Sequence, residues 1–277
     1  MKLIKPSVEI LEQEDLFKHI ELCARTCYKS EDKITDDSAE KFVQMLINKG
    51  HTAMLEHATV YLKDVEIIAR YSCNPYSKVT YTKDYNYATT NYRVLLENNW
   101  LDDLRFQTEP TEYHQNRISV KFVCCRSISH ELVRHRVFSF AQESTRYCNY
   151  SKDKFNNEIT FIIPSWLDLK EGVFEIDAYG NFVVGNEETG ITVQNFWLHS
   201  LKESESSYFK LLSSGWQPQQ ARAVLPNSLK TEIVMTGFIY DWEHFFGLRT
   251  AQSAHPQMRE LAIPLYEMFK ERNLIKT

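Results

Sequence analysis

The chain has 277 residues, of which 43% are apolar and 25% are charged, with a net charge of −5 and an isoelectric point near 6.0. These values are ordinary for a water-soluble globular protein with a sizeable core. They disfavour a general DNA- or RNA-binding protein, because such proteins usually carry net positive charge.

The first residues show no secretory signal, and no apolar run reaches the ~18 residues of a membrane span. The six cysteines include no Cys-x-x-Cys pair, which disfavours a zinc ribbon. Free thiols in a chain of this kind indicate a cytoplasmic location. We therefore expect no metal site and no membrane contact. The cysteines are Cys23, Cys27, Cys73, Cys124, Cys125 and Cys148.

The N-terminal part predicts two helices and a strand. Residues 13–25 place Leu16, Ile20 and Cys23 on one helical face. Residues 38–49 predict a second amphipathic helix that Gly50 ends. The segment LEHATVYLK, residues 55–63, alternates as a strand does. The tyrosine- and asparagine-rich stretch from about 72 to 117 shows no clear pattern.

The middle of the chain predicts a strand at 118–125. A helix follows through SHELVRHR, which Ser127 or Ser129 can cap, and it is expected to end near residues 138–140. The stretch from about 165 to 190 has several acidic residues and glycines but no clear pattern.

The C-terminal part predicts a long amphipathic helix at 191–214, which Gly215 ends, and a short helix with Pro218 in its first turn. A strand follows over KTEIVMTGFI, residues 230–239. Asp241 can cap the next helix, and Pro256 can open the last one, in which Pro264 predicts a kink or break.

Strands and helices are mixed without regular βαβ alternation, which favours an α+β fold. There is no internal repeat and no convincing linker. We therefore predict a single compact domain over residues 1–277, with a mostly antiparallel sheet and flanking helices.

The stretch RHRVFSFAQESTRY, residues 134–147, concentrates positive charge in an acidic chain. Arginine forms bidentate bonds to phosphate and stays charged. Arg134 and Arg136, two residues apart in a helix, would point in different directions. The following QESTR loop offers hydroxyls, backbone N–H groups and Arg146 to one anion, which suits a nucleotide. The alternative is a solvated basic helix face, although the apolar neighbours of VRHR indicate partial burial.

Arg134, His135 and Arg136, followed after seven residues by Ser144, resemble the signature of the flavin-dependent thymidylate synthases. Four other segments resemble elements of that family in the same order. The stretches at about 72–117 and 165–190 look like insertions relative to its compact members. The four segments are GHTAMLEHA (50–58), ARAVLP (221–226), DWEHFFGLR (241–249) and AHPQMRELA (254–262).

The resemblance implies that the protein makes dTMP from dUMP. 5,10-Methylenetetrahydrofolate would supply the carbon, FAD would carry the hydride and NADPH would re-reduce the flavin. It also implies a homotetramer whose sites are shared between subunits, and no metal.

Carried over residue by residue, the resemblance implies a set of dUMP contacts. Arg249 is the expected catalytic residue, because a fixed cation favours ionised uracil N3. Ser144 is expected to be a binding hydroxyl, since no local base accompanies it. The implied contacts are Glu131, Arg134, Gln142, Glu143, Ser144, Thr145, Arg146, Arg222 and Arg249.

The resemblance also implies a set of FAD contacts. For His51 and His57 the alternative is a structural histidine pair, and for His244 it is a surface histidine. Phe238 and Tyr240 stand where relatives often have Asn and Arg that contact FAD, which puts the geometry of flavin binding in doubt. The implied contacts are His51, Glu56, Arg134, His135, Arg136, Gln142 and His244.

Two other functions remain open. The chain could bind nucleotides without turnover, because of Phe238 and Tyr240. It could also bind RNA or DNA through the basic motif and scattered tyrosines, which the acidic net charge disfavours.

Overall fold

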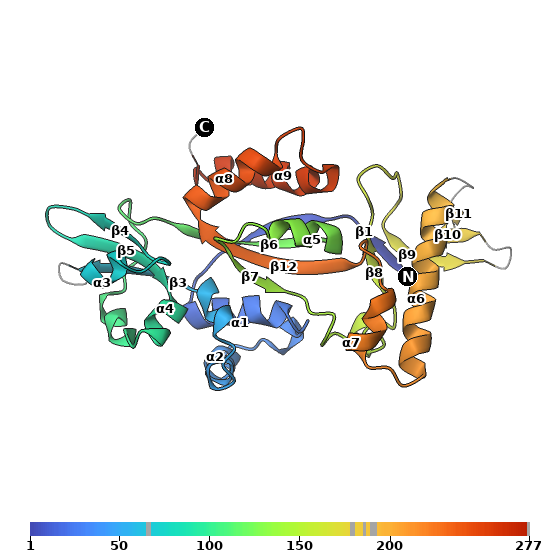
Figure 1. Ribbon diagram of the computed structural model, residues 1–277, viewed down its shortest axis with the longest axis horizontal. Helices are drawn as coiled ribbons and strands as arrows, with labels where there is room; N and C mark the ends of the chain where they lie inside the picture. The colour runs from blue at the N-terminus through green and yellow to red at the C-terminus, as the bar shows by residue number, and fades with distance from the viewer. Residues whose placement is uncertain (65–67, 178–180, 185–186, 189–192, 276–277) are drawn as a thin grey trace.

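The structure is a computed structural model that describes residues 1–64, 68–177, 181–184, 187–188 and 193–275. These residues form three β-sheets with helices packed around them (Figure 1). The predicted mixture of helices and mostly antiparallel strands is confirmed, although the strands divide among three sheets instead of one.

The central sheet is antiparallel, in the order β2 (Ser7–Leu11), β6 (Arg117–Cys125), β12 (Lys230–Phe238) and β7 (Ser139–Gln142). Both predicted strands, 118–125 and 230–239, are confirmed to within a residue or two. They pair along their whole length, from Lys230 opposite Cys125 to Phe238 opposite Arg117. The inner residues of β12, Thr231–Gly237, are all buried, so both faces of this strand are covered.

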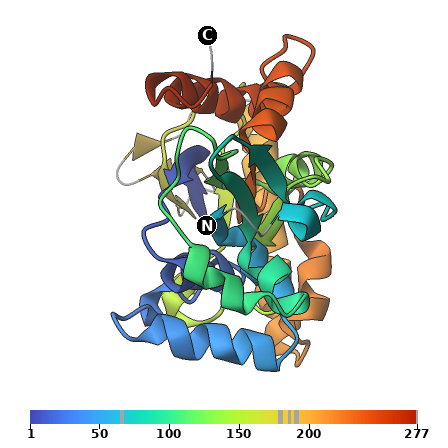
Figure 2. The same cartoon turned by 90° about the vertical axis from the view of Figure 1, so that its left-hand side faces the viewer.

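Helices cover both faces of this sheet (Figures 1 and 2). α8 (Ile239–Arg249) and α9 (Pro256–Glu271) lie on one side, where Trp242 and Phe245 pack on Phe122 of β6. α1 (Leu16–Thr26) and α2 (Ser38–Asn48) lie on the other side, at the bottom of Figure 2. Both predicted N-terminal helices are thus confirmed. Asp15 caps α1 by accepting from the amides of Phe17 and Lys18.

The predicted cap of the first C-terminal helix is wrong, and the break considered for the last helix does not occur. α8 begins at Ile239 with Phe238 at its N-cap position, so Asp241 lies inside the first turn and does not cap it. α9 continues through Pro264 without a break. A proline removes one helical hydrogen bond, but burial of Leu261, Leu265 and Phe269 holds both halves of α9 on the same core.

A second sheet joins β3 (Thr59–Asp64), β5 (Asn86–Asn91) and β4 (Lys78–Tyr81). The predicted strand 55–63 is only partly correct, because Thr52–His57 forms a short 3-10 helix, η2. That turn buries Leu55 among α1 and α2 and directs His57 to β12. The stretch 72–117 therefore has regular structure, which also includes α4 (Tyr92–Glu97) and the 3-10 helix η3 (Leu101–Phe106). The short helix α3 (Ile68–Ser72) directly precedes it.

The third sheet has the order β11 (Glu187–Glu188), β10 (Phe182–Val184), β9 (Gly172–Ile176), β1 (Lys2–Ile4) and β8 (Thr160–Ile162). Only the β1–β8 pair among the described strands is parallel. The predicted long helix is α6 (Val193–Ser213), and its expected residues 191–192 lie outside the described residues. Parts of the stretch 165–190 also lie outside them, at 178–180, 185–186 and 189–190.

Three short 3-10 helices and one short α-helix complete the described elements. The predicted short helix with Pro218 is confirmed as α7 (Pro218–Ala221), and it leads into the 3-10 helix η5 (Arg222–Val224). Two more 3-10 helices are η1 (Glu31–Lys33) and η4 (Asp153–Phe155). None of the described helices is both long and apolar enough to cross a lipid bilayer.

Candidate active site

The RHR motif lies in a turn, and not in a helix as predicted. α5 (Arg126–Leu132) ends before Arg134, and β7 begins at Ser139. The chain must turn here because Ser139 pairs with Thr236 at the edge of β12. Neither predicted serine caps α5: its N-cap is Cys125, and Ser129 Oγ instead donates to the carbonyl of Arg126.

Gly237 of β12 makes room for this turn. A Cβ atom at Gly237 would overlap the ring of Phe138, the last residue before β7. Phe138 is buried and meets Trp242 edge-on, with 4.8 Å between ring centroids. A glycine in the interior of a strand often marks such a close approach. The turn that carries the RHR motif is therefore held down by one aromatic ring over Gly237.

Arg249, Glu131 and His135 form a hydrogen-bonded cluster above this turn. Arg249 Nη1 contacts Glu131 Oε2 at 2.7 Å, and Nη2 donates to the Glu131 carbonyl at 3.1 Å. Arg249 Nε donates to His135 Nε2 at 2.9 Å. Three residues that the sequence indicated separately are thus brought together, with all three guanidinium nitrogens hydrogen-bonded.

His135 is buried and serves as a neutral acceptor. Burial, with smaller effects from Arg249 and His244, lowers the pKa of His135 to about 4. Its ring also meets Phe245 edge-on, with 5.0 Å between centroids. A neutral imidazole can accept from Arg249, whereas a protonated one would repel it.

Arg134 and Arg136 are exposed on the same turn. Neither forms an ion pair with any residue in the described part of the chain. Exposed arginines without an acidic partner are available to an anionic ligand. Both arginines thus remain accessible, whereas His135 between them is buried.

The QESTR segment begins on β7 and leaves the sheet after Gln142. Gln142 Nε2 donates to Ser129 Oγ at 2.8 Å and to Thr231 Oγ1 at 3.2 Å, which fixes its amide over β12. Glu143 is buried, and its carboxylate contacts Lys230 Nζ at 3.0 Å. Glu143 therefore forms an internal ion pair with Lys230.

Ser144, Thr145 and Arg146 form the tight turn that follows. Ser144 Oγ accepts from the Arg146 amide at 3.3 Å, and no described base contacts it. Arg222 of η5 donates from Nη1 to Thr145 Oγ1 at 3.1 Å. Arg146 and Arg222 are both exposed. Two hydroxyls and two accessible guanidinium groups thus meet here from segments 77 residues apart.

The remaining predicted flavin residues lie on η2 and α8. Glu56 forms an ion pair with Arg93 at 2.5 Å and accepts from Ser139 Oγ at 2.7 Å, so it joins η2 to the RHR turn. His51 and His244 are exposed. His57 is fully buried and hydrogen-bonded to Thr236 Oγ1 at 2.7 Å. This position agrees with the alternative that His57 is a structural residue.

A cavity of about 700 Å³ lies between the RHR turn and the segment 74–98. Glu56 and Arg136, both predicted from the sequence, line it. The sequence did not indicate the other charged residues in its wall as ligand contacts: four belong to the stretch 72–117, which has no recognisable pattern, and Asp241 was expected only to cap a helix. These are Lys78, Arg93, Glu97, Arg117 and Asp241.

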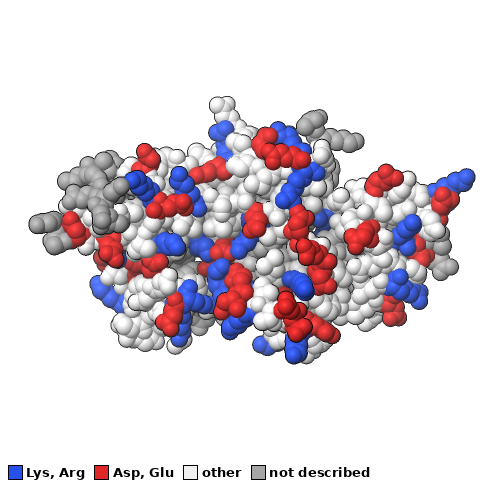
Figure 3. Space-filling view, turned by 180° about the vertical axis from the view of Figure 1, so that it is seen from behind, with Lys and Arg blue, Asp and Glu red and all other residues white. Residues whose placement is uncertain are grey.

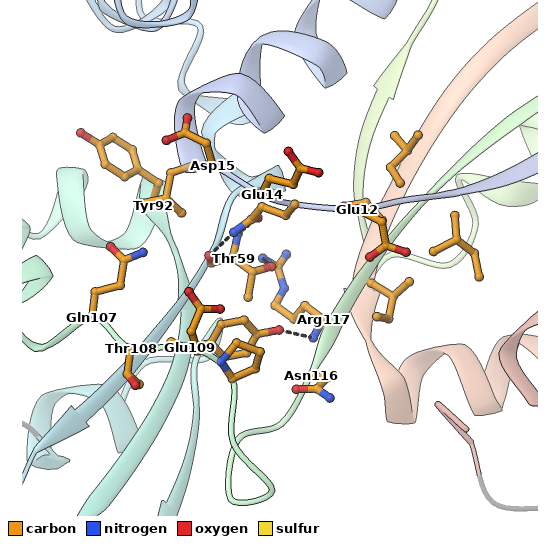
Figure 4. Close-up of a pocket in the computed structure, with 18 of the residues that line it drawn as sticks. Glu12, Glu14, Asp15, Thr59, Tyr92, Gln107, Thr108, Glu109, Asn116 and Arg117 are labelled. Carbon is orange, nitrogen blue, oxygen red and sulfur yellow. Dashed lines mark hydrogen bonds between the residues drawn. The ribbon is translucent and has the colours of Figure 1, made fainter. Parts of the chain in front are cut away.

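A second cavity, of about 510 Å³, lies between the start of α1 and β3 (Figure 4). Four acidic residues surround it, and Arg117 lies among them in the figure. Arg117 lines both cavities. Of the acidic residues, Glu12 is paired with Arg272. The four are Glu12, Glu14, Asp15 and Glu109.

Acidic and basic side chains are interspersed over the face shown in Figure 3. The described residues on that face form no broad basic surface. A protein that binds long nucleic acids normally presents one.

A sequence profile of the family described as thymidylate synthase complementing protein matches residues 61–273. The chain belongs to the flavin-dependent thymidylate synthase family. The flavin-dependent thymidylate synthase of Pyrococcus furiosus is 31% identical over 153 residues, which are 55% of this chain and 54% of that protein. Those of Corynebacterium efficiens and Corynebacterium aurimucosum are 26% and 27% identical over 258 residues.

The two Corynebacterium matches cover 91% and 92% of this chain and 75% and 76% of those proteins. The match with the Pyrococcus relative spans about half of that protein's length. A solved UMP/dUMP methylase from Streptomyces cacaoi, bound with 5-Br dUMP, has 19% identity and a TM-score of 0.43 over 98% of this chain and 91% of that chain.

Phe238 and Tyr240, which stand where the resemblance implies polar flavin contacts, flank the start of α8 in this family member. Phe238 lines the larger cavity, and Tyr240 is exposed on α8. The cysteines of this family member are all free, and burial raises the pKa of Cys148 to about 12, so its thiol is a poor nucleophile. Among the described residues, no group of three or more potential ligands is arranged to hold a metal ion.

Proposed function

We propose that this protein converts dUMP to dTMP, with 5,10-methylenetetrahydrofolate as carbon donor, FAD as hydride carrier and NADPH as reductant. The observation that carries the proposal is the contact of Arg249 with His135 and Glu131. It joins the RHR signature to the expected catalytic arginine, although 114 residues separate Arg249 from His135.

The turn formed by Ser144, Thr145 and Arg146 fits the phosphate of dUMP. It offers two hydroxyls, and Arg222 adds a second cation through its bond to Thr145. Arginine and hydroxyl donors are suited to phosphate oxygens. Gln142, the last residue of β7, presents an amide that Ser129 and Thr231 orient.

The cavity beside the RHR turn fits a flavin nucleotide. Its volume of about 700 Å³ is within the usual range for ligand sites. Arg136 and Glu56 lie in its wall, and exposed Arg134 lies two residues from Arg136. Bound FAD would supply the hydride chemistry of the reaction, and the protein would orient the ligands and stabilise charge.

Arg249 would favour the ionised form of the uracil ring. A guanidinium remains charged and stabilises an adjacent anion. His135 and Glu131 restrict the rotation of this side chain, so the cation is positioned before substrate binds. The uracil would bind the same guanidinium group as Glu131, whose carboxylate accepts a hydrogen bond from Nη1.

We further propose a cytoplasmic homotetramer with sites shared between subunits. Arg222 follows α7 and Arg249 ends α8, and these two helices lie on opposite sides of β12 in Figure 1. Val133, Val137, Tyr240 and Leu248 are exposed apolar residues near the RHR turn and on α8. Exposed apolar surface beside a site supports contact with another copy of the chain.

The flavin spectrum of the purified protein, recorded with and without dUMP, tests this proposal. We expect a yellow protein that releases tritium from C5-labelled dUMP only with both NADPH and methylenetetrahydrofolate. Flavin and dUMP binding without tritium release would favour a protein that binds nucleotides without turnover. A colourless protein that takes up no added FAD and releases no tritium would overturn the proposal.

A further inference from the structure

Arg117 is a buried cation without an ion pair to any carboxylate in the described part of the chain. Only 9% of its surface is exposed. Nη1 donates to the Glu56 carbonyl at 2.9 Å and to Thr59 Oγ1 at 3.4 Å, and neither Nε nor Nη2 donates to a described residue. A buried charge without a counter-charge is unfavourable. Glu56 and Asp241 act on this charge only from beyond ion-pair distance, so the two free donors point to an anion from outside the described chain.

The two cavities that Arg117 lines differ in charge. The cavity in Figure 4 is surrounded by four carboxylates, and they would repel an anion. The larger cavity contains Lys78 and Arg136 on its wall, and neither forms an ion pair with a described residue. Arg93 also lines the larger cavity, but it is already paired with Glu56 and Glu97. An anion is therefore favoured on the side of the larger cavity.

Phe238 organises the cations in that cavity. It lies opposite Arg117 in the β6–β12 register, and the Arg117 guanidinium carbon is 5.5 Å from the centre of its ring. Lys78 Nζ is 5.8 Å from the centre of the same ring. Lys78 comes from β4, so the ring links two segments that are far apart in the sequence. Cation–π contacts of this kind hold a charged group near an aromatic face.

Asp241 provides the complementary acceptor. It lines the same cavity and forms no ion pair with a described residue. A ligand with phosphates, hydroxyl or amino donors and a planar ring would match the cations, the carboxylate and the exposed aromatic ring of Tyr76. A nucleotide has all three.

We infer that Lys78 and Arg117 bind a phosphate of the dinucleotide cofactor, so that the segment 74–98 forms one wall of the flavin site. This inference rests on the proposed function, and it assigns a ligand contact to a segment that the sequence motifs do not include. It also makes Phe238 a support for two phosphate-binding cations in this protein.

The first test is the charge reversal Lys78→Glu, with Lys83→Glu as its matched control. Both lysines are exposed on the same part of the chain, but Lys83 does not line the cavity. We expect the Kd for FAD to rise about 10- to 100-fold in Lys78→Glu, as for loss of a charge-assisted bond. The Kd for dUMP and the FAD affinity of Lys83→Glu should stay within about twofold.

The second test is Arg117→Gln compared with Arg117→Lys, with Tm measured alongside. We expect Arg117→Gln to weaken FAD binding, and the lysine variant to restore part of it at the same Tm as the glutamine variant. Unchanged FAD affinity in Lys78→Glu would overturn the inference. So would a loss of FAD affinity in Arg117→Gln that is fully explained by a lower Tm. In either case the proposed function stands as long as the wild-type protein binds flavin. A wild-type protein that binds no FAD would overturn both.

Discussion

Arg249 and Glu131 form an ion pair of 2.7 Å between residues 118 positions apart, and Arg249 also bonds to the Glu131 carbonyl. The contact joins the end of α8 to the end of α5. Because His135 holds the third side of the guanidinium, the position of Arg249 depends on the turn that follows α5. Glu131 therefore positions a residue that we propose to be catalytic.

Arg249→Lys should lower kcat for dTMP formation by at least about 100-fold, since a lysine keeps the charge but cannot reproduce the three-sided contact. The flavin spectrum should remain. The measurement is tritium release at saturating dUMP.

Glu131→Gln is the companion variant, because glutamine can still accept from Arg249. Its kcat should fall less than that of Arg249→Lys. Near wild-type turnover in Arg249→Lys would remove Arg249 from the chemistry.

Arg222→Ala should raise the Kd for dUMP about tenfold, because it removes one of two accessible cations at the Ser144–Arg146 turn. Calorimetric titration with dUMP measures it. Thr145→Val removes only the hydroxyl that holds Arg222, so its effect should be smaller. Equal dUMP affinity in wild type and Arg222→Ala would contradict the assignment of the phosphate to this turn.

Gly237→Ala should destabilise the protein by about 1–3 kcal/mol, as overpacking of a well-packed core usually does. The added methyl group would displace the Phe138 ring and with it the RHR turn. Denaturant unfolding gives the free energy of unfolding, and flavin affinity should fall in the same variant. Gly247→Ala is the control, since a Cβ there meets no atom within 4 Å. If both variants were equally stable, Phe138 would not depend on Gly237.

Two buried histidines are joined by a chain of hydroxyls through the central sheet. His19 Nε2 contacts Ser119 Oγ at 2.9 Å, Ser119 contacts Thr236 at 2.7 Å, and Thr236 contacts His57 Nδ1 at 2.7 Å. Burial lowers the pKa of His19 to about 4 and that of His57 to about 3, with smaller contributions from nearby cationic and histidine groups.

The free energy of unfolding should therefore decrease as the pH falls from about 6.5 towards 4. In this window the unfolded chain binds protons at these histidines that the folded chain does not, so the contribution is complete above the ordinary histidine pKa and is lost below it. Urea unfolding between pH 7.5 and 5 measures the slope. His57→Gln should reduce the slope, and substitution of exposed His130 should not. A slope unaffected by His57→Gln would contradict this origin.

The local sequence is sufficient to predict those helices and strands whose signals lie within a few residues of one another. The helices at 16–26, 38–48 and 193–213 and the strands β6 and β12 follow from apolar periodicity, caps and glycine stops. The residue types of the motif around Arg134 and Ser144 likewise indicate a phosphorylated ligand. Membership of the family that this motif resembles is confirmed by the match over residues 61–273.

The packing of the whole chain establishes where those residues meet. The sequence predicts that RHR continues a helix, but pairing of Ser139 with Thr236 and burial of Phe138 over Gly237 require a turn. The stretch 72–117 has no readable period, because its strands pair with each other and with β3 in a small separate sheet.

The amino-acid sequence alone sets the chemistry of the ligand-binding groups, since residue type determines charge and hydrogen-bonding capacity. The folded chain is needed to show that Arg249 contacts His135 and that Lys78 and Arg117 flank Phe238. Such contacts join residues far apart in the chain, and they depend on strand register and burial of the whole core, which no local pattern contains.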